Sequence, residues 1–181
     1  MELPLRYSYR IMHPRPVAVL LSRSKDGKIN GCTVAWYTPI NVEPFIFGVS
    51  VAMKRLTYAY IKESGEATLN ILPASLVEGI HYVGSISGRE NPSKLLEARF
   101  VLEKSLKVDV PHIKQSLAYV EAKLIGEKEF ADHSLLYFEG VRTWVNEETF
   151  QQGMWRKMEN LLLHVGKNVY ATECRYFEVE K

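Results

Sequence analysis

The feature that most constrains the fold is a succession of short apolar runs, with sequence signals for tight turns between them. Residues 17–21 form a continuous apolar run, which is typical of a strand covered on both faces. Residues 25–28 contain Asp-Gly, which supplies the positive φ of a hairpin turn, so residues 29–37 are the expected partner strand. Further strands are predicted at residues 45–51, 67–72, 118–125 and 135–145, followed by apolar runs at 161–164 and 169–171 and an edge strand at 174–179.

Helical spacing is confined to short segments. Residues 54–64 have apolar positions at helical spacing and end at Gly65, a favourable stop for a helix. Residues 74–83 also show helical spacing, and residues 92–98 have room for one or two turns. Because a parallel sheet needs a helical crossover between most strands, so few helices favour an antiparallel arrangement.

Prolines mark the parts expected to lie outside the sheet. Residues 1–16 carry three prolines and are expected to be irregular, and Pro39 and Pro44 bracket a predicted loop. Residues 146–160 are interpreted as a connection that folds over another part of the molecule. The fold class predicted from these patterns is mainly β with short helices, as one antiparallel barrel domain over residues 1–181.

Composition excludes several classes of function. The chain has 181 residues with 23 Lys and Arg against 21 Asp and Glu, and this small surplus predicts no nucleic-acid partner. Cys32 and Cys174 have no metal-ligand spacing, so we expect no metal site and two inert thiols. No stretch resembles a signal peptide or a membrane span, which predicts a cytoplasmic protein that does not act at a membrane.

The most informative stretch is residues 30–57. In residues 45–51 large apolar side chains alternate with small ones, so one face would be buried and the other open to a flat ligand. Helical spacing begins directly afterwards, which places Ser50, Lys54, Arg55 and Thr57 at a strand-to-helix junction. A guanidinium, a hydroxyl and unpaired backbone N–H groups suit a phosphate. From the residues alone, a solvated first helical turn explains Arg55 and Thr57 equally well.

Several short motifs also occur in a recognisable order. They are Arg15-Pro16-Val17, Asn30, Val34-Ala35-Trp36-Tyr37-Thr38-Pro39-Ile40, Glu43-Pro44, Lys54-Arg55-Leu56-Thr57, Ser87-Gly88-Arg89, Asp132-His133 and His164-Val165-Gly166. Together they resemble the flavin reductase-like, FMN-binding split-barrel family over residues 14–170. This group includes flavoredoxin and NAD(P)H:flavin oxidoreductases. The resemblance implies a split β-barrel of antiparallel Greek-key type and a homodimer with FMN near the dimer interface.

The resemblance also implies which residues contact FMN. The segment from Thr33 to Trp36 would border the flavin ring, Ser50 to Ala52 would line the ribityl chain, and Arg55 would bind the phosphate. The full implied cofactor set is Thr33, Val34, Ala35, Trp36, Ser50, Val51, Ala52, Lys54, Arg55, Thr57, Ser85, Ser87, Gly88, Arg89 and His164.

Asp132-His133 resembles the Gly-Asp-His motif of the reductase branch, with Ala131 in place of the glycine, and it makes His133 the candidate catalytic residue. Each assignment has a structural alternative. His133 is also explained by a hydrogen bond within a turn, and His164 by a position in the core. Trp36 and Trp155 are explained by packing.

The leading functional hypothesis is an FMN-dependent oxidoreductase. It would accept hydride from NADH or NADPH and pass electrons to free flavin, a ferric complex or a protein acceptor. The first alternative is an FMN-carrying electron-transfer protein of the flavoredoxin type without nicotinamide oxidation. The second is a pyridoxamine-phosphate-oxidase-like barrel, or one that has lost its cofactor.

Overall fold

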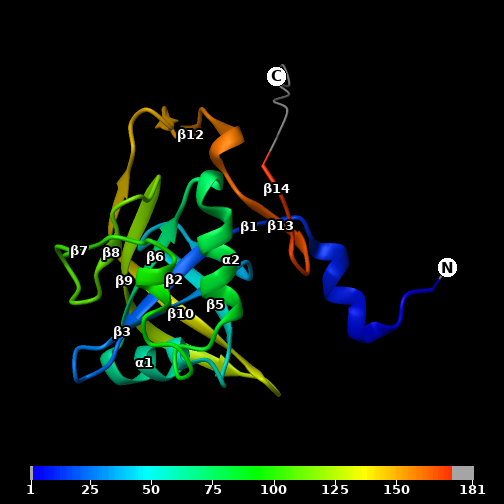
Figure 1. Ribbon diagram of the computed structural model, residues 1–181, viewed down its shortest axis with the longest axis horizontal. Helices are drawn as coiled ribbons and strands as arrows, with labels where there is room; N and C mark the ends of the chain where they lie inside the picture. Colours follow the sequence, from blue (N-terminus) through cyan, green and yellow to red (C-terminus); the bar gives the residue numbers. More distant parts are fainter. Residues whose placement is uncertain (1, 173–181) are drawn as a thin grey trace.

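The computed structural model describes residues 2–172. Its centre is a seven-stranded antiparallel sheet in the order β3-β2-β6-β9-β10-β5-β4 (Figure 1). The strands are β2 (Ala18–Arg23), β3 (Ile29–Val34), β4 (Tyr37–Asn41), β5 (Ile46–Ala52), β6 (Glu66–Ile71), β9 (Ala118–Glu129) and β10 (His133–Val145).

The sheet curls into a barrel because its two edge strands are consecutive in the chain. β3 and β4 are joined by Ala35 and Trp36 alone, although they lie at opposite edges of the strand order. The backbone N–H of Ser50 in β5 donates to the carbonyl oxygen of Trp36 at 2.8 Å, which ties the connection to the neighbouring strand. The predicted antiparallel barrel with short helices is therefore confirmed.

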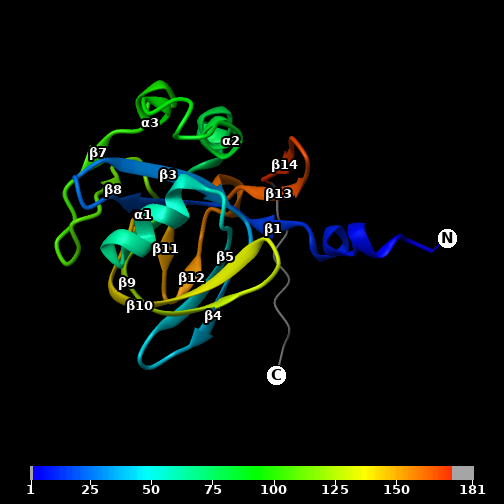
Figure 2. The same ribbon diagram turned by 90° about the horizontal axis from the view of Figure 1, so that it is seen from below.

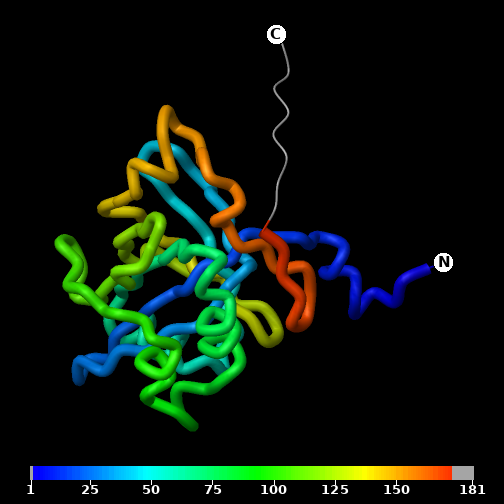
Figure 3. The backbone as a smooth tube through the Cα atoms, turned by 45° about the horizontal axis from the view of Figure 1, so that its top comes forward, coloured from blue at the N-terminus to red at the C-terminus, as the bar shows by residue number. Residues whose placement is uncertain are grey.

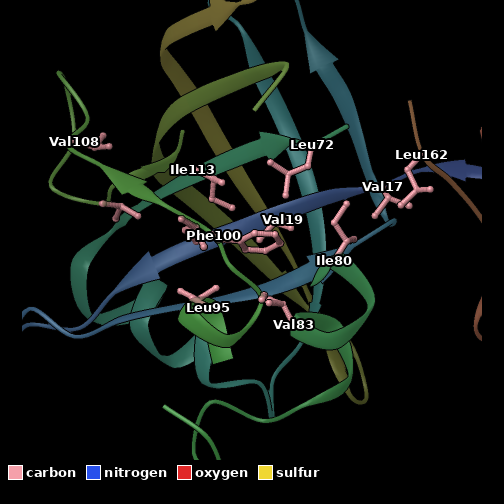
Figure 4. Packing of buried hydrophobic residues seen from close by; sticks show 13 residues of the cluster. Val17, Val19, Leu72, Ile80, Val83, Leu95, Phe100, Val108, Ile113 and Leu162 are labelled. Carbon is pink, nitrogen blue, oxygen red and sulfur yellow. The ribbon is translucent and has the colours of Figure 1, made fainter. Parts of the chain in front are cut away.

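Two apolar cores lie on the two faces of β2. Ala18 and Leu20 point into the barrel, where they meet Phe47, Leu136 and other buried side chains. Val19 and Leu21 point the other way, into a second core under the helices (Figure 4). A strand buried on both faces must be apolar at every position, which explains why residues 17–21 show no alternation.

Helices cover the side of the barrel formed by β2 and β3. α1 (Leu56–Ser64) begins two residues later than predicted because Arg55 is extended, and it ends at Gly65 with φ 70° as expected. The second predicted helix consists of η2 (Ala74–Leu76) and α2 (Val77–Ser85), and the third is the single turn α3 (Lys94–Glu97). α2 and α3 lie next to each other above β3 (Figure 2).

Three boundaries predicted from the sequence are wrong. Residues 29–37 are two strands, because the chain leaves β3 at Ala35 to cross the barrel. Pro39 lies within β4 rather than in a loop, and β4 tolerates a residue without an N–H because it is an edge strand. The N-terminal segment is not irregular but forms the 3-10 helix η1 (Leu5–Met12), which begins directly after Pro4 and stands away from the barrel (Figure 3).

The remaining elements are short. β1 (Arg15–Pro16), β13 (Leu163–Gly166) and β14 (Val169–Ala171) form a small sheet in which Arg15 pairs with His164. The segment 146–160 holds β11 (Phe150–Gln151), β12 (Met154–Trp155) and η3 (Met158–Asn160), and a further hairpin consists of β7 (Leu102–Glu103) and β8 (His112–Ile113). The edge strand predicted at 174–179 lies outside the described residues. Within residues 2–172, no helix is long and apolar enough to cross a membrane.

Candidate functional site

Three adjoining pockets meet at Arg55. The α1 pocket, of about 360 Å³, lies beside the start of α1. The end pocket, of about 150 Å³, opens at the end of the barrel, and the hairpin pocket, of about 290 Å³, faces the β13–β14 hairpin. Arg55 lines all three, so the pockets adjoin at this side chain.

The position of Arg55 follows from local backbone structure. It is the extended residue before α1, so its side chain leaves the strand-to-helix junction instead of following the helix face. Its Nη1 donates to the carbonyl oxygen of Gly84 near the end of α2 at 2.9 Å. This hydrogen bond holds the guanidinium between α1 and α2, at the point where the pockets join.

The α1 pocket is electrostatically positive. Lys54, Arg55 and Lys94 line it, and Glu90 is the only carboxylate among its described lining residues. Lys94 is only 2% exposed, and its Nζ donates to the carbonyl oxygens of Val83 at 3.0 Å and Ile86 at 2.8 Å.

Burial makes Lys94 an unusual cation. Desolvation is the largest influence and lowers the pKa of its ammonium, a raising effect of Cys32 comes second, and the nearby Arg55 guanidinium lowers the pKa by the least. An ammonium has three N–H donors, and two of them go to neutral carbonyl oxygens. A buried cation balanced by dipoles rather than by a carboxylate favours an anion in the adjoining pocket.

Polar packing fixes the floor of the α1 pocket. Thr57 is fully buried, and its Oγ1 accepts a hydrogen bond from Nδ2 of Asn30 at 2.7 Å. The loop after α2 lies directly on Asn30, because a Cβ on Gly88 would be 2.0 Å from the Asn30 Oδ1 atom. Cys32 is a buried free thiol in the same wall, and its burial raises its pKa, which agrees with an unreactive group.

The end pocket brings together residues from three strands. The register of β10 on β5 pairs His133 with Ala52, and the Ser50 hydrogen bond places Trp36 beside them. The Trp36 and His133 rings lie with their centroids 5.2 Å apart and tilted by 31°. A charged carboxylate can only accept, so the 2.8 Å contact between Asp132 and Nδ1 of His133 places a proton on Nδ1. That hydrogen bond lowers the pKa of Asp132.

The hairpin pocket combines β13 and β14 with α2. His81 of α2 is within hydrogen-bond distance of the Tyr170 hydroxyl at 3.0 Å, through Nδ1. Nε2 of His164 makes a 3.0 Å contact with the carbonyl oxygen of Lys167 at the hairpin turn. These contacts fix both imidazole rings at the pocket wall.

A family model and a related protein sequence match this chain. The model described as "Flavin reductase like domain" matches residues 9–173. The chain belongs to this family. Its sequence is 30% identical over 164 residues to an uncharacterized protein of Pyrococcus abyssi, a match that covers 91% of this chain and 93% of the relative.

Solved structures of other proteins have the same fold as this chain. An FMN-binding protein from Thermus thermophilus has a TM-score of 0.86 at 26% identity, over 99% of this chain and 96% of its own. Flavoredoxin from Methanosarcina acetivorans has a TM-score of 0.85 at 23% identity, over 99% and 94% respectively. The flavin reductase-like family and the split-barrel fold inferred from the sequence are therefore confirmed.

The structure brings nearly all the predicted site residues of this flavin reductase-like chain together. Arg89 is the exception, since it lines none of the three pockets and instead donates Nη1 to the carbonyl oxygen of Lys54 at 2.7 Å. The predicted residues that do line one or more of the three pockets are Thr33, Val34, Ala35, Trp36, Ser50, Val51, Ala52, Lys54, Arg55, Thr57, Ser85, Ser87, Gly88, His133 and His164. Their roles toward a ligand stay predictions.

Sequence reasoning missed other residues of the site. Lys94 follows a proline-containing loop like any surface lysine, and no local pattern marks it as buried. His81 and Tyr170 come from segments 89 residues apart, so only the fold shows that they meet. Asn30 offered a signal, because it is one of the short motifs in which the chain resembles the family.

Proposed function

We propose that this protein binds FMN and acts as an oxidoreductase that accepts hydride from NADH or NADPH and passes electrons to free flavin, a ferric complex or a protein acceptor. The observation that supports it best is the buried Lys94 ammonium beside Arg55 in a pocket that continues into the end pocket. A phosphate at one end of a long molecule and a flat ring at the other match this arrangement.

The residues present fit the parts of FMN. The α1 pocket offers Lys54, Arg55 and Lys94 to a phosphate dianion, together with the hydroxyl of Ser87. The end pocket offers the backbone of the β3–β4 connection, which suits the hydrogen-bonding edge of a flavin ring. The similar Thermus thermophilus protein is FMN-binding, which supports the same ligand here.

FMN, when bound, supplies the two-electron chemistry by accepting hydride from a reduced nicotinamide. The protein's own groups position and shield the ligand. Trp36 closes one side of the end pocket, and Asp132 holds the His133 ring in one orientation. The contact with Asp132 occupies Nδ1 and leaves Nε2 as the ring nitrogen available to a ligand at this pocket.

The test has two stages. Protein freed of flavin is first titrated with FMN, and quenching of flavin fluorescence gives the dissociation constant. The loaded protein is then mixed anaerobically with NADH or NADPH, and we expect the flavin absorbance to bleach. Reduction by dithionite alone would show an electron carrier instead, and failure to bind FMN would contradict the whole proposal.

We also propose that the protein works as a homodimer. η1 exposes Leu5, Ile11 and Met12 to 90%, 76% and 63%, which is costly for an isolated chain in water. The helix projects from the barrel, which it meets where Tyr9 contacts Trp36, and a projecting apolar segment can pack on a second copy (Figure 3). Sedimentation at micromolar concentration should show a dimer, and a 20.8 kDa species alone would contradict it.

A further inference from the structure

The hairpin pocket carries more positive charge and more donors than a flavin ring needs. Arg55, the residue before α1, lines it on one side, and Lys167 lines it from the β13–β14 turn. Within the described part of the chain, no Asp or Glu lines it. The imidazoles of His81 and His164 and the hydroxyls of Ser85 and Tyr170 complete its wall. A pocket of about 290 Å³ with this lining selects for an anionic group.

The polar groups of this pocket are held in place by one another. His81 contacts Tyr170 through Nδ1 and the Ser85 hydroxyl through Nε2, at 3.0 and 3.3 Å. The carbonyl oxygen of His164 is within 3.0 Å of the His13 Nδ1 atom, which anchors the hairpin to the segment before β1. The site is therefore organised before a ligand arrives, which reduces the cost of binding.

The hairpin pocket is also distinct from the α1 pocket. The guanidinium of Arg55 is tied to Gly84 where the two pockets adjoin, and Lys94 lines the α1 pocket but not the hairpin pocket. Thr33, Ala35 and Trp36 line both the hairpin pocket and the end pocket. A ligand anchored at the hairpin can therefore extend its other end toward the expected flavin ring.

We propose that the hairpin pocket binds the anionic group, a phosphate or a carboxylate, of the second substrate. Lys167 and Arg55 attract the charge, and the polar side chains of His81, Ser85 and Tyr170 line the place where the anion would lie. This inference rests on the proposed function, since it assigns the second ligand of the same site. The phosphate of a dinucleotide reductant and the carboxylate of an organic acceptor share the chemistry that this pocket recognises.

The test is a calorimetric titration of inorganic pyrophosphate into protein saturated with FMN, so that the α1 pocket is already filled. We expect saturable binding to the wild type and at least about tenfold weaker binding to Lys167→Glu, because an attraction becomes a repulsion. Lys104→Glu is the matched control, since it reverses an exposed charge in the connection between β7 and β8, and it should bind as the wild type does. FMN affinity should be the same in all three proteins.

Benzoate in place of pyrophosphate separates the two sources. Tighter binding of pyrophosphate supports a dinucleotide phosphate, and tighter binding of benzoate supports a carboxylate acceptor. Absence of binding to the loaded wild type, or equal binding to Lys167→Glu, overturns the inference.

Failure of the proposed function would be recognised separately. If FMN does not bind, pyrophosphate is titrated into Lys94→Met, whose α1 pocket lacks its buried cation. A Lys167-dependent signal in that background supports the anion site alone, and loss of all binding overturns it.

Discussion

The α1 pocket and the hairpin pocket are both positively charged, but they are built in different ways. In the α1 pocket the polar groups are buried: Lys94 is 2% exposed and Thr57 is fully buried, each with hydrogen-bond partners inside the protein. In the hairpin pocket Lys167 is exposed at a turn. Buried charges are costly to leave unbalanced, whereas exposed ones are screened by water and salt. From this difference we expect the proposed ligand of the first pocket to be held more tightly than the proposed ligand of the second.

Arg55→Ala should have the largest effect, because this side chain belongs to both pockets. We expect FMN affinity to fall by about 1.5–3 kcal/mol, the range for losing charge-assisted hydrogen bonds. Pyrophosphate binding by the FMN-loaded variant should weaken as well. Arg23→Ala is the control, since Arg23 pairs with Asp109 away from the pockets. Unchanged FMN affinity would remove Arg55 from the site.

Lys94→Met should separate the two pockets. FMN affinity should fall by about 2 kcal/mol, since an ion-strengthened hydrogen bond to phosphate is lost. Riboflavin, which has no phosphate, should bind the variant and the wild type equally. The substitution leaves the carbonyl oxygens of Val83 and Ile86 without this donor, so the flavin-free variant should melt earlier than the wild type, and its melting temperature checks that the fold is intact. Equal losses for FMN and riboflavin would place Lys94 away from the phosphate.

Gly88→Ala tests how closely the loop must approach the floor of the α1 pocket. The new methyl group would meet the Asn30 amide at 2.0 Å, so the loop must move outward. We expect FMN affinity to fall by about 1 kcal/mol and pyrophosphate binding by the loaded protein to stay the same. Gly126→Ala adds a methyl group 3.6 Å from its nearest neighbour and should change neither. A weaker hairpin pocket in Gly88→Ala would show that the two sites are not independent.

The smallest effect concerns pH. The pKa of Lys94 lies below its ordinary value of 10.5 because burial disfavours the charged form. An anion binds the protonated ammonium, so FMN affinity should decline as the pH rises through this lowered pKa, and the decline should begin before 10.5. The same titration of Lys94→Met should lack this component. If both proteins show the same profile, another group is responsible.

The sequence was sufficient to predict the features that depend on residues close together in the chain. The alternation in β5, the change to helical spacing and the stop at Gly65 all lie within 20 residues, and they placed Arg55 at the strand-to-helix junction, where the structure has it. Propensity could not show that Pro39 lies on an edge strand, because edge and centre are properties of the assembled sheet. Nor could it show that Lys94 is buried, since its cover comes from the carbonyl groups of α2 and the following loop.

Trp36 lies between the N-terminal helix η1 and the candidate ligand site and can couple the two. Tyr9 of η1 meets the edge of this indole, with centroids 5.6 Å apart, while the same indole lies beside His133. Coupling of this kind is reciprocal. If a ligand displaces the indole and thereby changes the free energy of packing η1 on the barrel, the packing of η1 changes the free energy of ligand binding by the same amount. The position of η1 and the affinity of the site for its ligand should consequently vary together.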